Sequence, residues 1–178
     1  MKTLYVLRHA KSSWKDLKLS DFERPLNKRG KKAAPVMGKL MLEKGLLPEL
    51  IISSPAERAK QTANLIKDSA KIHSEIKFDE RIYEASTNTL VHILSEVNAN
   101  ISSVMIVGHN PGFEGIVGIL TGEYERMPTA ALAVIQLNID SWQEVTQDCG
   151  NLITVFRPKE YRSMSSRDFQ QKENLPNS

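Results

Sequence analysis

The sequence is poor in cysteine and has neither a long apolar run nor a long basic run. Cys149 is the one cysteine among 178 residues, which excludes an internal disulfide and a cysteine-built metal site. The apolar run at the N-terminus stops at Arg8 and is too short for a signal peptide or a membrane span. The formal net charge is only +3 and no run of more than three Lys or Arg residues occurs, so nothing favours binding to nucleic acid. We therefore expect a soluble cytoplasmic protein that binds neither membranes nor nucleic acid.

The glycines and histidines lack the spacings of two common kinds of site. No G-x-x-x-x-G-K or G-x-G-x-x-G stretch occurs, which disfavours a nucleotide-dependent kinase or dehydrogenase. No two of the four histidines have the i, i+4 spacing of helical metal ligands; they are His9, His73, His92 and His109. We therefore expect no metal and no cofactor.

Short apolar runs alternate along the chain with longer segments of helical spacing, a pattern typical of an α/β sheet. The apolar runs predict strands at residues 3–7, 50–52, 76–78, 104–107, 131–137 and 152–156. The other segments predict four helices. The predicted N-caps are Asn27, Thr87 or Asn88, and Asn110, which Pro111 follows in the first turn, and Ser54-Pro55 predicts a capping box with proline at the first helical position.

The ends of the first helix and of the domain can also be predicted. Gly45 is suited to end the first helix, while Pro35 inside it predicts a kink or a later start. The length fits one domain with a sizeable core. We assign residues 1–157 to this domain and expect residues 158–178, which contain few apolar side chains, to be a loosely packed or disordered tail.

Polar side chains follow three of the predicted strands. These groups are Arg8-His9, Ser53-Ser54-Pro55 with Arg58, and His109-Asn110. Ligands of open α/β sheets bind beyond the carboxyl ends of strands, where helix N-termini add positive dipole ends. Each group alone is typical of a loop surface, a solvated helix or a strand–helix junction. Their joint occurrence predicts a cationic pocket for a phosphoryl group.

These segments resemble the motifs of the histidine phosphatase superfamily, the phosphoglycerate mutase-like phosphatases, and especially its small SixA-type phosphohistidine phosphatases. The resemblance extends from about residue 3 to residue 157. The chain lacks the long insertions that build a substrate lid in the mutases. The matching stretches are Leu7-Arg8-His9-Ala10-Lys11-Ser12, Arg24-Pro25-Leu26-Asn27-Lys28-Arg29-Gly30, Ser53 to Thr62, and Val107-Gly108-His109-Asn110-Pro111.

The resemblance implies a three-layer α/β/α sandwich with a mostly parallel central sheet that contains an antiparallel strand. It also implies a metal-independent phosphatase in which His9 is the nucleophile and becomes a covalent phosphohistidine. Arg8, Arg58 and His109 would bind the phosphoryl group. Ser12 matches a nearby serine of the family whose hydroxyl can donate a hydrogen bond to the phosphate. The positive charges of Arg8 and Arg58 should keep His9 neutral, as attack requires.

The proton donor and the substrate are less sharply defined. The resemblance assigns the acid to Glu84, with Glu80 as the main competitor. Ala10 replaces the family's glycine, and Lys15 stands where many mutase-like members have a substrate-contacting asparagine. We expect the substrate to be a protein phosphohistidine, whose imidazole leaves more easily than an alkoxide. A small-molecule phosphomonoesterase, a mutase and a non-catalytic phosphate-binding regulatory protein are the alternatives.

Overall fold

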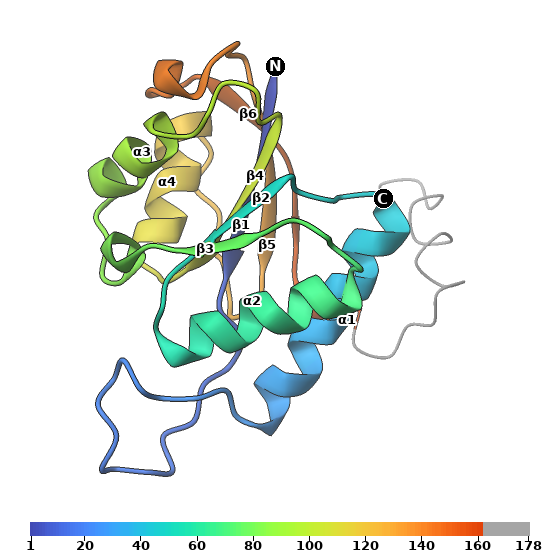
Figure 1. Cartoon of the computed structure of the whole chain (residues 1–178), viewed down its shortest axis with the longest axis vertical. Coiled ribbons are helices and arrows are strands. Elements are labelled where there is room, and N and C mark those ends of the chain that lie inside the picture. The colour runs from blue at the N-terminus through green and yellow to red at the C-terminus, as the bar shows by residue number, and fades with distance from the viewer. Residues whose placement is uncertain (162–178) are drawn as a thin grey trace.

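The structure is a computed structural model that describes residues 1–161 and contains one six-stranded sheet with helices on both faces (Figure 1). The strands are β1 (Lys2–Arg8), β2 (Leu50–Ser53), β3 (Ile76–Phe78), β4 (Ser103–Gly108), β5 (Leu132–Leu137) and β6 (Gly150–Phe156). The α-helices are α1 (Lys28–Lys44), α2 (Glu57–Ser69), α3 (Thr87–Ser95) and α4 (Gly112–Thr121). Three short 3₁₀ helices are η1 (Glu80–Ile82), η2 (Trp142–Glu144) and η3 (Pro158–Glu160).

The sheet has the strand order β3-β2-β4-β1-β5-β6. The first four of these strands are parallel, whereas β5 is antiparallel to both β1 and β6. This topology confirms the predicted α/β/α fold with an antiparallel strand. Arg8 pairs with Gly108, and Ser53 pairs with Val107, so β1, β2 and β4 end side by side.

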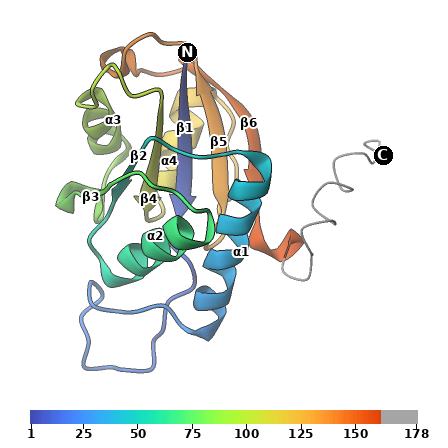
Figure 2. The same cartoon turned by 45° about the vertical axis from the view of Figure 1, so that its right-hand side comes forward.

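The two faces of the sheet are covered by different helix pairs. Helices α1 and α2 cover one face, and α3 and α4 cover the other (Figure 2). Along β1 the side chains alternate: Tyr5 and Leu7 pack with α1 and α2, while Leu4 and Val6 pack with α3 and α4. Both faces are buried, which explains why this strand is a continuous apolar run in the sequence.

Helix α1 has the ends that the sequence predicts. The Asn27 side chain accepts a hydrogen bond from the Gly30 N–H at 2.9 Å, and Gly45 ends the helix in the left-handed conformation with φ 67°. The helix continues through Pro35, so a later start is wrong.

The other three helix starts differ from the prediction. Helix α2 begins at Glu57 and has no side-chain cap, so the predicted capping box at Ser54 is wrong. The cap of α3 is Ser86, one residue before the predicted Thr87, and α4 begins after Pro111 instead of at it. At the start of α2 the Ser54 hydroxyl binds His109 instead of capping the helix, so the local pattern does not fix this first turn.

The predicted tail is only partly covered by the described residues. Its first part forms η3, and Tyr161 is buried with its ring 6.0 Å from that of Phe156. Residues 162–178 lie outside the described residues, so the domain boundary at residue 157 stays a prediction. None of the helices in residues 1–161 combines the length and the apolar character of a membrane span.

Candidate active site

The ends of β1, β2 and β4 surround a pocket of about 270 Å³, here called the His9 pocket. Five predicted site residues line it: Arg8, His9, Ser12, Arg58 and His109. The other lining residues are Lys11, Trp14, Arg24, Asn110 and Thr129. Residues that are more than a hundred positions apart in the sequence therefore meet in one place, because β1, β2 and β4 are neighbours in the sheet.

The His9 ring is buried and held in one tautomer. Its Nδ1 lies 2.7 Å from the Ala10 carbonyl oxygen, which can only accept, so Nδ1 carries the proton. The lone pair is then on Nε2, which faces the Arg58 Nε–H at 3.4 Å. Burial, and then the charges of Arg58 and Arg8, lower the pKa of His9 to about 4. The expected neutral state is confirmed in direction, although burial contributes more than the arginines do.

Two of the three arginines of the pocket, Arg8 and Arg58, are anchored on their outer sides. Arg8 Nη1 donates to the Met127 carbonyl at 3.0 Å, while its Nε is buried without a partner among the described residues. Arg58 Nη1 and Nη2 donate to the backbone oxygen and the carboxylate of Asp21, at 2.6 and 3.0 Å. A buried N–H without a partner is costly, so the free Arg8 Nε indicates an anion-binding position.

His109 has a partner on one ring nitrogen only. Its Nε2 lies 2.8 Å from Ser54 Oγ, which also accepts from the Ala56 N–H at 3.2 Å. The Ser54 hydroxyl has no other acceptor among the described residues, so we assign it as the donor to Nε2 and place the ring proton on Nδ1, which is buried and unpaired among these residues. Burial first, and then the charges of His9 and Arg58, lower the pKa of His109 to about 3. His109 is therefore a neutral donor that lines the same pocket as the free Arg8 N–H.

Comparison with known proteins agrees with this geometry. Residues 4–103 match the family model of the histidine phosphatase superfamily (branch 1). The chain belongs to this superfamily. A candidate phosphohistidine phosphatase, SixA, of Agrobacterium tumefaciens has a similar structure, with a TM-score of 0.76 and 30% identity, and the match covers 88% of this chain and 98% of that one.

Two relatives in sequence show how broad the superfamily is. An uncharacterized chloroplastic protein of Arabidopsis thaliana is 32% identical over 152 residues, which are 80% of this chain and 70% of that protein. A 2,3-bisphosphoglycerate-dependent phosphoglycerate mutase of Streptomyces avermitilis is 36% identical over 89 residues, which are only 46% of this chain and 35% of the mutase. As a member of the superfamily, the chain is a phosphoryl-transfer enzyme of the phosphatase type.

A network around Asp21 was not predicted. The Asp21 carboxylate accepts from Tyr83 Oη at 2.6 Å, from Arg24 at 2.8 Å and from Arg58. The Tyr83 hydroxyl first, and then Arg24 and Arg58, hold the pKa of Asp21 below its usual range, and Asp21 raises the pKa of Tyr83 to about 12. Arg24 also donates to Ser12 Oγ inside the pocket. Arg24 lies in the arginine-proline-leucine stretch that resembles the family but was not predicted as a site residue, and no sequence signal pointed to Asp21 or Tyr83.

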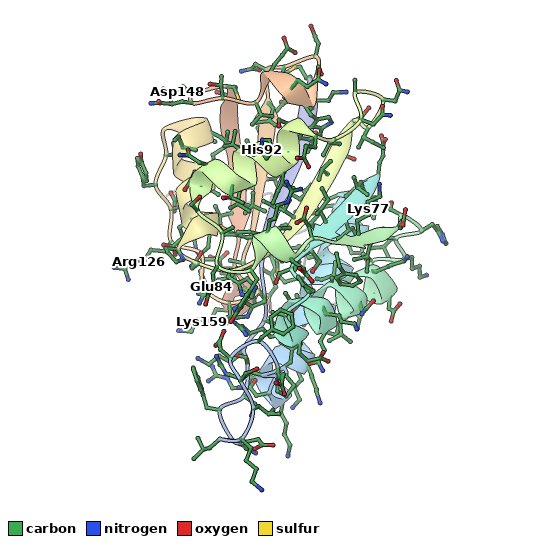
Figure 3. The ribbon with its side chains drawn as sticks, turned by 60° about the vertical axis from the view of Figure 1, so that its left-hand side comes forward. Lys77, Glu84, His92, Arg126, Asp148 and Lys159 are labelled. Atoms are coloured by element: carbon green, nitrogen blue, oxygen red, sulfur yellow. The ribbon has the colours of Figure 1, made fainter. Side chains whose placement is uncertain are left out.

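Glu84 lies in a neighbouring pocket of about 470 Å³, here called the Glu84 pocket. The two pockets share Arg58, His109 and Asn110 as lining residues, but Glu84 does not line the His9 pocket. It is exposed near the carboxyl edge of the sheet (Figure 3). Its competitor Glu80 lines neither pocket. The structure thus brings Glu84 near the predicted site without placing it beside His9.

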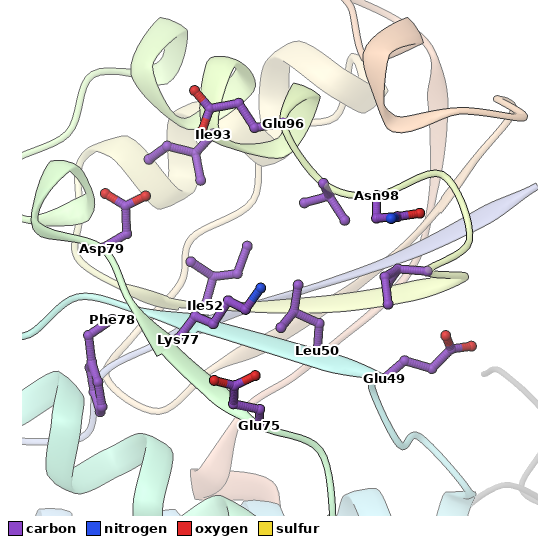
Figure 4. Close-up of a pocket in the computed structure, with 12 residues that line it drawn as sticks. Glu49, Leu50, Ile52, Glu75, Lys77, Phe78, Asp79, Ile93, Glu96 and Asn98 are labelled. Atoms are coloured by element: carbon purple, nitrogen blue, oxygen red, sulfur yellow. The ribbon is translucent and has the colours of Figure 1, made fainter.

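A larger pocket of about 510 Å³ lies between β2, β3 and α3 (Figure 4). Apolar side chains such as Ile52 and Ile93 line it together with four carboxylates, but the described residues around it include no histidine and no arginine. Lys77 is the one cationic side chain among its described lining residues and is outnumbered by the four carboxylates, which disfavour a phosphoryl group, so size does not identify the site here. Within residues 1–161 no group of three or more His, Cys, Asp or Glu side chains could hold a metal ion.

Proposed function

We propose that this enzyme hydrolyses phosphohistidine on proteins through a covalent phosphohistidine at His9. The observation that carries the proposal is the chemistry of the His9 pocket: its described lining residues supply three arginines and two histidines but no carboxylic acid. Such a pocket favours a dianionic phosphoryl group and a leaving group that departs without a strong acid beside it.

In the first step the His9 Nε2 lone pair attacks phosphorus. The P–N bond to the substrate imidazole breaks and its electron pair returns to the substrate nitrogen, while the substrate ring takes up a proton from solvent and leaves as neutral imidazole. Arg8, Arg58 and His109 donate to the phosphoryl oxygens, where charge is spread in the transition state. The Ala10 carbonyl accepts a hydrogen bond from His9 Nδ1–H. This hydrogen bond stabilises the positive charge that the ring acquires as the new bond forms.

In the second step a water oxygen attacks the phosphorus on His9. The P–Nε2 bond breaks, its electron pair returns to the ring, and inorganic phosphate leaves as dihydrogen phosphate, which carries the oxygen and both protons of the water and then loses a proton to solvent. The pKa of His9 near 4 makes the ring a good leaving group at neutral pH, because the neutral form is its stable state in this pocket. The same burial thus favours both attack and release.

A small-molecule phosphomonoesterase is the second candidate. It is favoured by Glu84, which lines a pocket that shares Arg58 and His109 with the His9 pocket. An alkoxide leaving group needs a proton, and a carboxylic acid that approached from the Glu84 pocket would supply it. Lys15 does not line the His9 pocket, so a substrate contact through Lys15 finds no support.

The first experiment tests the nucleophile and the substrate together. The enzyme is mixed with proteins phosphorylated on histidine and with a panel of sugar phosphates, and phosphate release and the trapped phosphoenzyme are measured. We expect turnover of the phosphoproteins and an acid-labile phosphoenzyme, and His9→Ala should lower the rate at least about a thousandfold. Phosphate binding without hydrolysis would favour a non-catalytic protein, and phosphate transfer without release would favour a mutase.

Glu84 can be separated from Glu80 by their effects on two leaving groups. Glu84→Gln should slow hydrolysis of an alkyl phosphate about a hundredfold, because the alkoxide loses its acid, and should change phosphohistidine hydrolysis less than about threefold. The matched control is Glu80→Gln, which should leave both rates unchanged. An equal loss on both substrates would remove the reason for assigning leaving-group chemistry to Glu84.

A further inference from the structure

Large apolar side chains are concentrated on the loop that follows His9. Of the eight large apolar side chains that are exposed in residues 1–161, three lie on this β1–α1 loop (residues 9–27). They are Trp14, Leu17 and Phe22, with exposed fractions of 68%, 90% and 39%. The loop extends beyond the carboxyl edge of the sheet, where the His9 pocket opens (Figure 1).

The loop is held in place on both of its sides. The Ser13 N–H donates to the Pro25 carbonyl at 2.8 Å, and the Glu57 N–H of α2 donates to the Phe22 carbonyl at 3.0 Å. The Trp14 ring lies against Arg24, whose guanidinium carbon is 3.2 Å from the ring centre. A surface that is already ordered loses little conformational entropy when a partner binds.

The exposure of these side chains is not explained by a small substrate. Trp14 lines the His9 pocket, but Leu17 and Phe22 do not, and a metabolite bound in 270 Å³ would leave them in water. Phe22 contacts Tyr83 edge-on, with ring centres 5.1 Å apart, so its ring lies close to the Asp21 network. A macromolecule that delivers its phosphoryl group to His9 would cover all three.

The charges around the loop favour an acidic partner. Residues 8–24 together with Arg58 contain six basic and three acidic side chains. Lys15 and Lys18 are exposed on the loop and are balanced by the equally exposed Asp16 and Glu23. The excess of three positive charges therefore comes from Lys11 and the pocket arginines, of which Arg24 and Arg58 pair with Asp21. Positive charge at the mouth of the pocket beside exposed apolar groups matches a partner with an apolar patch and acidic groups around its phosphorylated residue.

We propose that Trp14, Leu17 and Phe22 form the docking surface for the protein that carries the phosphohistidine, and that this protein is acidic around its phosphorylated residue. The inference rests on the proposed function, since only a protein substrate needs such a surface. It adds the part of this chain that recognises the substrate and the chemical character of the partner.

The test compares a protein substrate with a small one on the full chain. The substrates are a panel of acidic and basic protein domains phosphorylated on histidine, and N-phosphoimidazole, which offers the same bond without a protein surface. Leu17→Asp should lower kcat/KM about tenfold for the acidic domains and change it less than about twofold for N-phosphoimidazole. Lys18→Glu should act in the same direction, and wild type should prefer acidic over basic domains.

A matched control places the same change at the amino ends of the strands, away from the His9 pocket. Leu47 is exposed in the segment between α1 and β2, and Leu47→Asp should leave both substrates unaffected. Equal rates of wild type and Leu17→Asp on the phosphoproteins, or an equal loss on both substrates, would overturn the docking surface. If wild type itself hydrolyses N-phosphoimidazole or esters but no phosphoprotein, the proposed function fails before any variant is compared.

Discussion

Asp21 places a carboxylate beside Arg24 and Arg58, two arginines of a pocket that has to bind an anion. It neutralises part of the charge of Arg58 and Arg24 while its backbone oxygen holds Arg58 in position. The Asn variant keeps the backbone contact and one acceptor oxygen, but it loses the charge and replaces the other acceptor oxygen by an NH2 group. Asp21→Asn should therefore strengthen binding of inorganic phosphate by on the order of 1 kcal/mol, or about fivefold in the inhibition constant.

The control for this charge is Asp16 on the same loop. Asp16 accepts from the Lys18 N–H at 3.0 Å, and no contact joins it to Arg58, so Asp16→Asn should change phosphate inhibition much less. Product inhibition at two ionic strengths gives both constants, and the difference should shrink at high salt. Weaker phosphate inhibition of Asp21→Asn would mean that Asp21 acts mainly by positioning Arg58.

At the residue scale the sequence predicts the groups that follow strands and misses those that meet through loops. His9 and His109 were predictable because each directly follows an apolar run, and parallel strands end at one edge. Asp21 and Tyr83 are 62 positions apart, and nothing in either neighbourhood indicates their hydrogen bond. Ser54 was assigned to a helix cap because its own segment has that pattern, but its hydroxyl binds His109.

At the element scale the crossing of α1 and α2 depends on Gly38. A Cβ at this position would collide with Ser69 Oγ of α2 and come within 3.1 Å of the Ile66 carbonyl oxygen. Gly38→Ala should destabilise the fold by about 1–3 kcal/mol, despite the better helix propensity of alanine, because the helices must separate. Urea unfolding followed by circular dichroism measures the change.

Two further variants identify the cause of the Gly38 effect. Ser69→Gly removes the colliding atoms, so Gly38→Ala should cost less than half as much in that background. Gly45→Ala meets no atom within 4 Å and should cost only about 1 kcal/mol, from the left-handed conformation alone. If Gly38→Ala costs the same in both backgrounds, the close approach of the helices is not the reason.

The elements themselves were largely predictable, and their first turns were not. The central strands β1 and β4 are buried on both faces, so each is a continuous apolar run in the sequence. The start of α1 was predicted correctly because Asn27 caps its own helix. The start of α2 was not, because the side chain that resembled a cap is used by the active site.

At the scale of the whole molecule, burying two neutral histidines makes stability depend on pH. A histidine in the unfolded chain has a pKa near about 6.5, whereas His9 and His109 in the fold have values of about 4 and about 3. Between pH 7 and pH 5 the unfolded chain therefore binds protons that the folded chain does not. Stability is fully present above pH 6.5 and falls below it, by at most about 1.4 kcal/mol per pH unit for each histidine.

Urea unfolding at pH 7 and pH 5 checks this dependence in a window above the ordinary pKa values of the carboxylates. The Asp21 pKa lies below its usual range, so the stability that Asp21 contributes is lost only at lower pH and does not enter. We expect wild type to lose on the order of 3 kcal/mol from pH 7 to pH 5. His9→Gln should lose about half of that slope, and His9→Gln with His109→Gln most of it. A free energy of unfolding that stays constant in wild type, or an unchanged slope in the double variant, would show that the buried rings are not the groups that take up the protons.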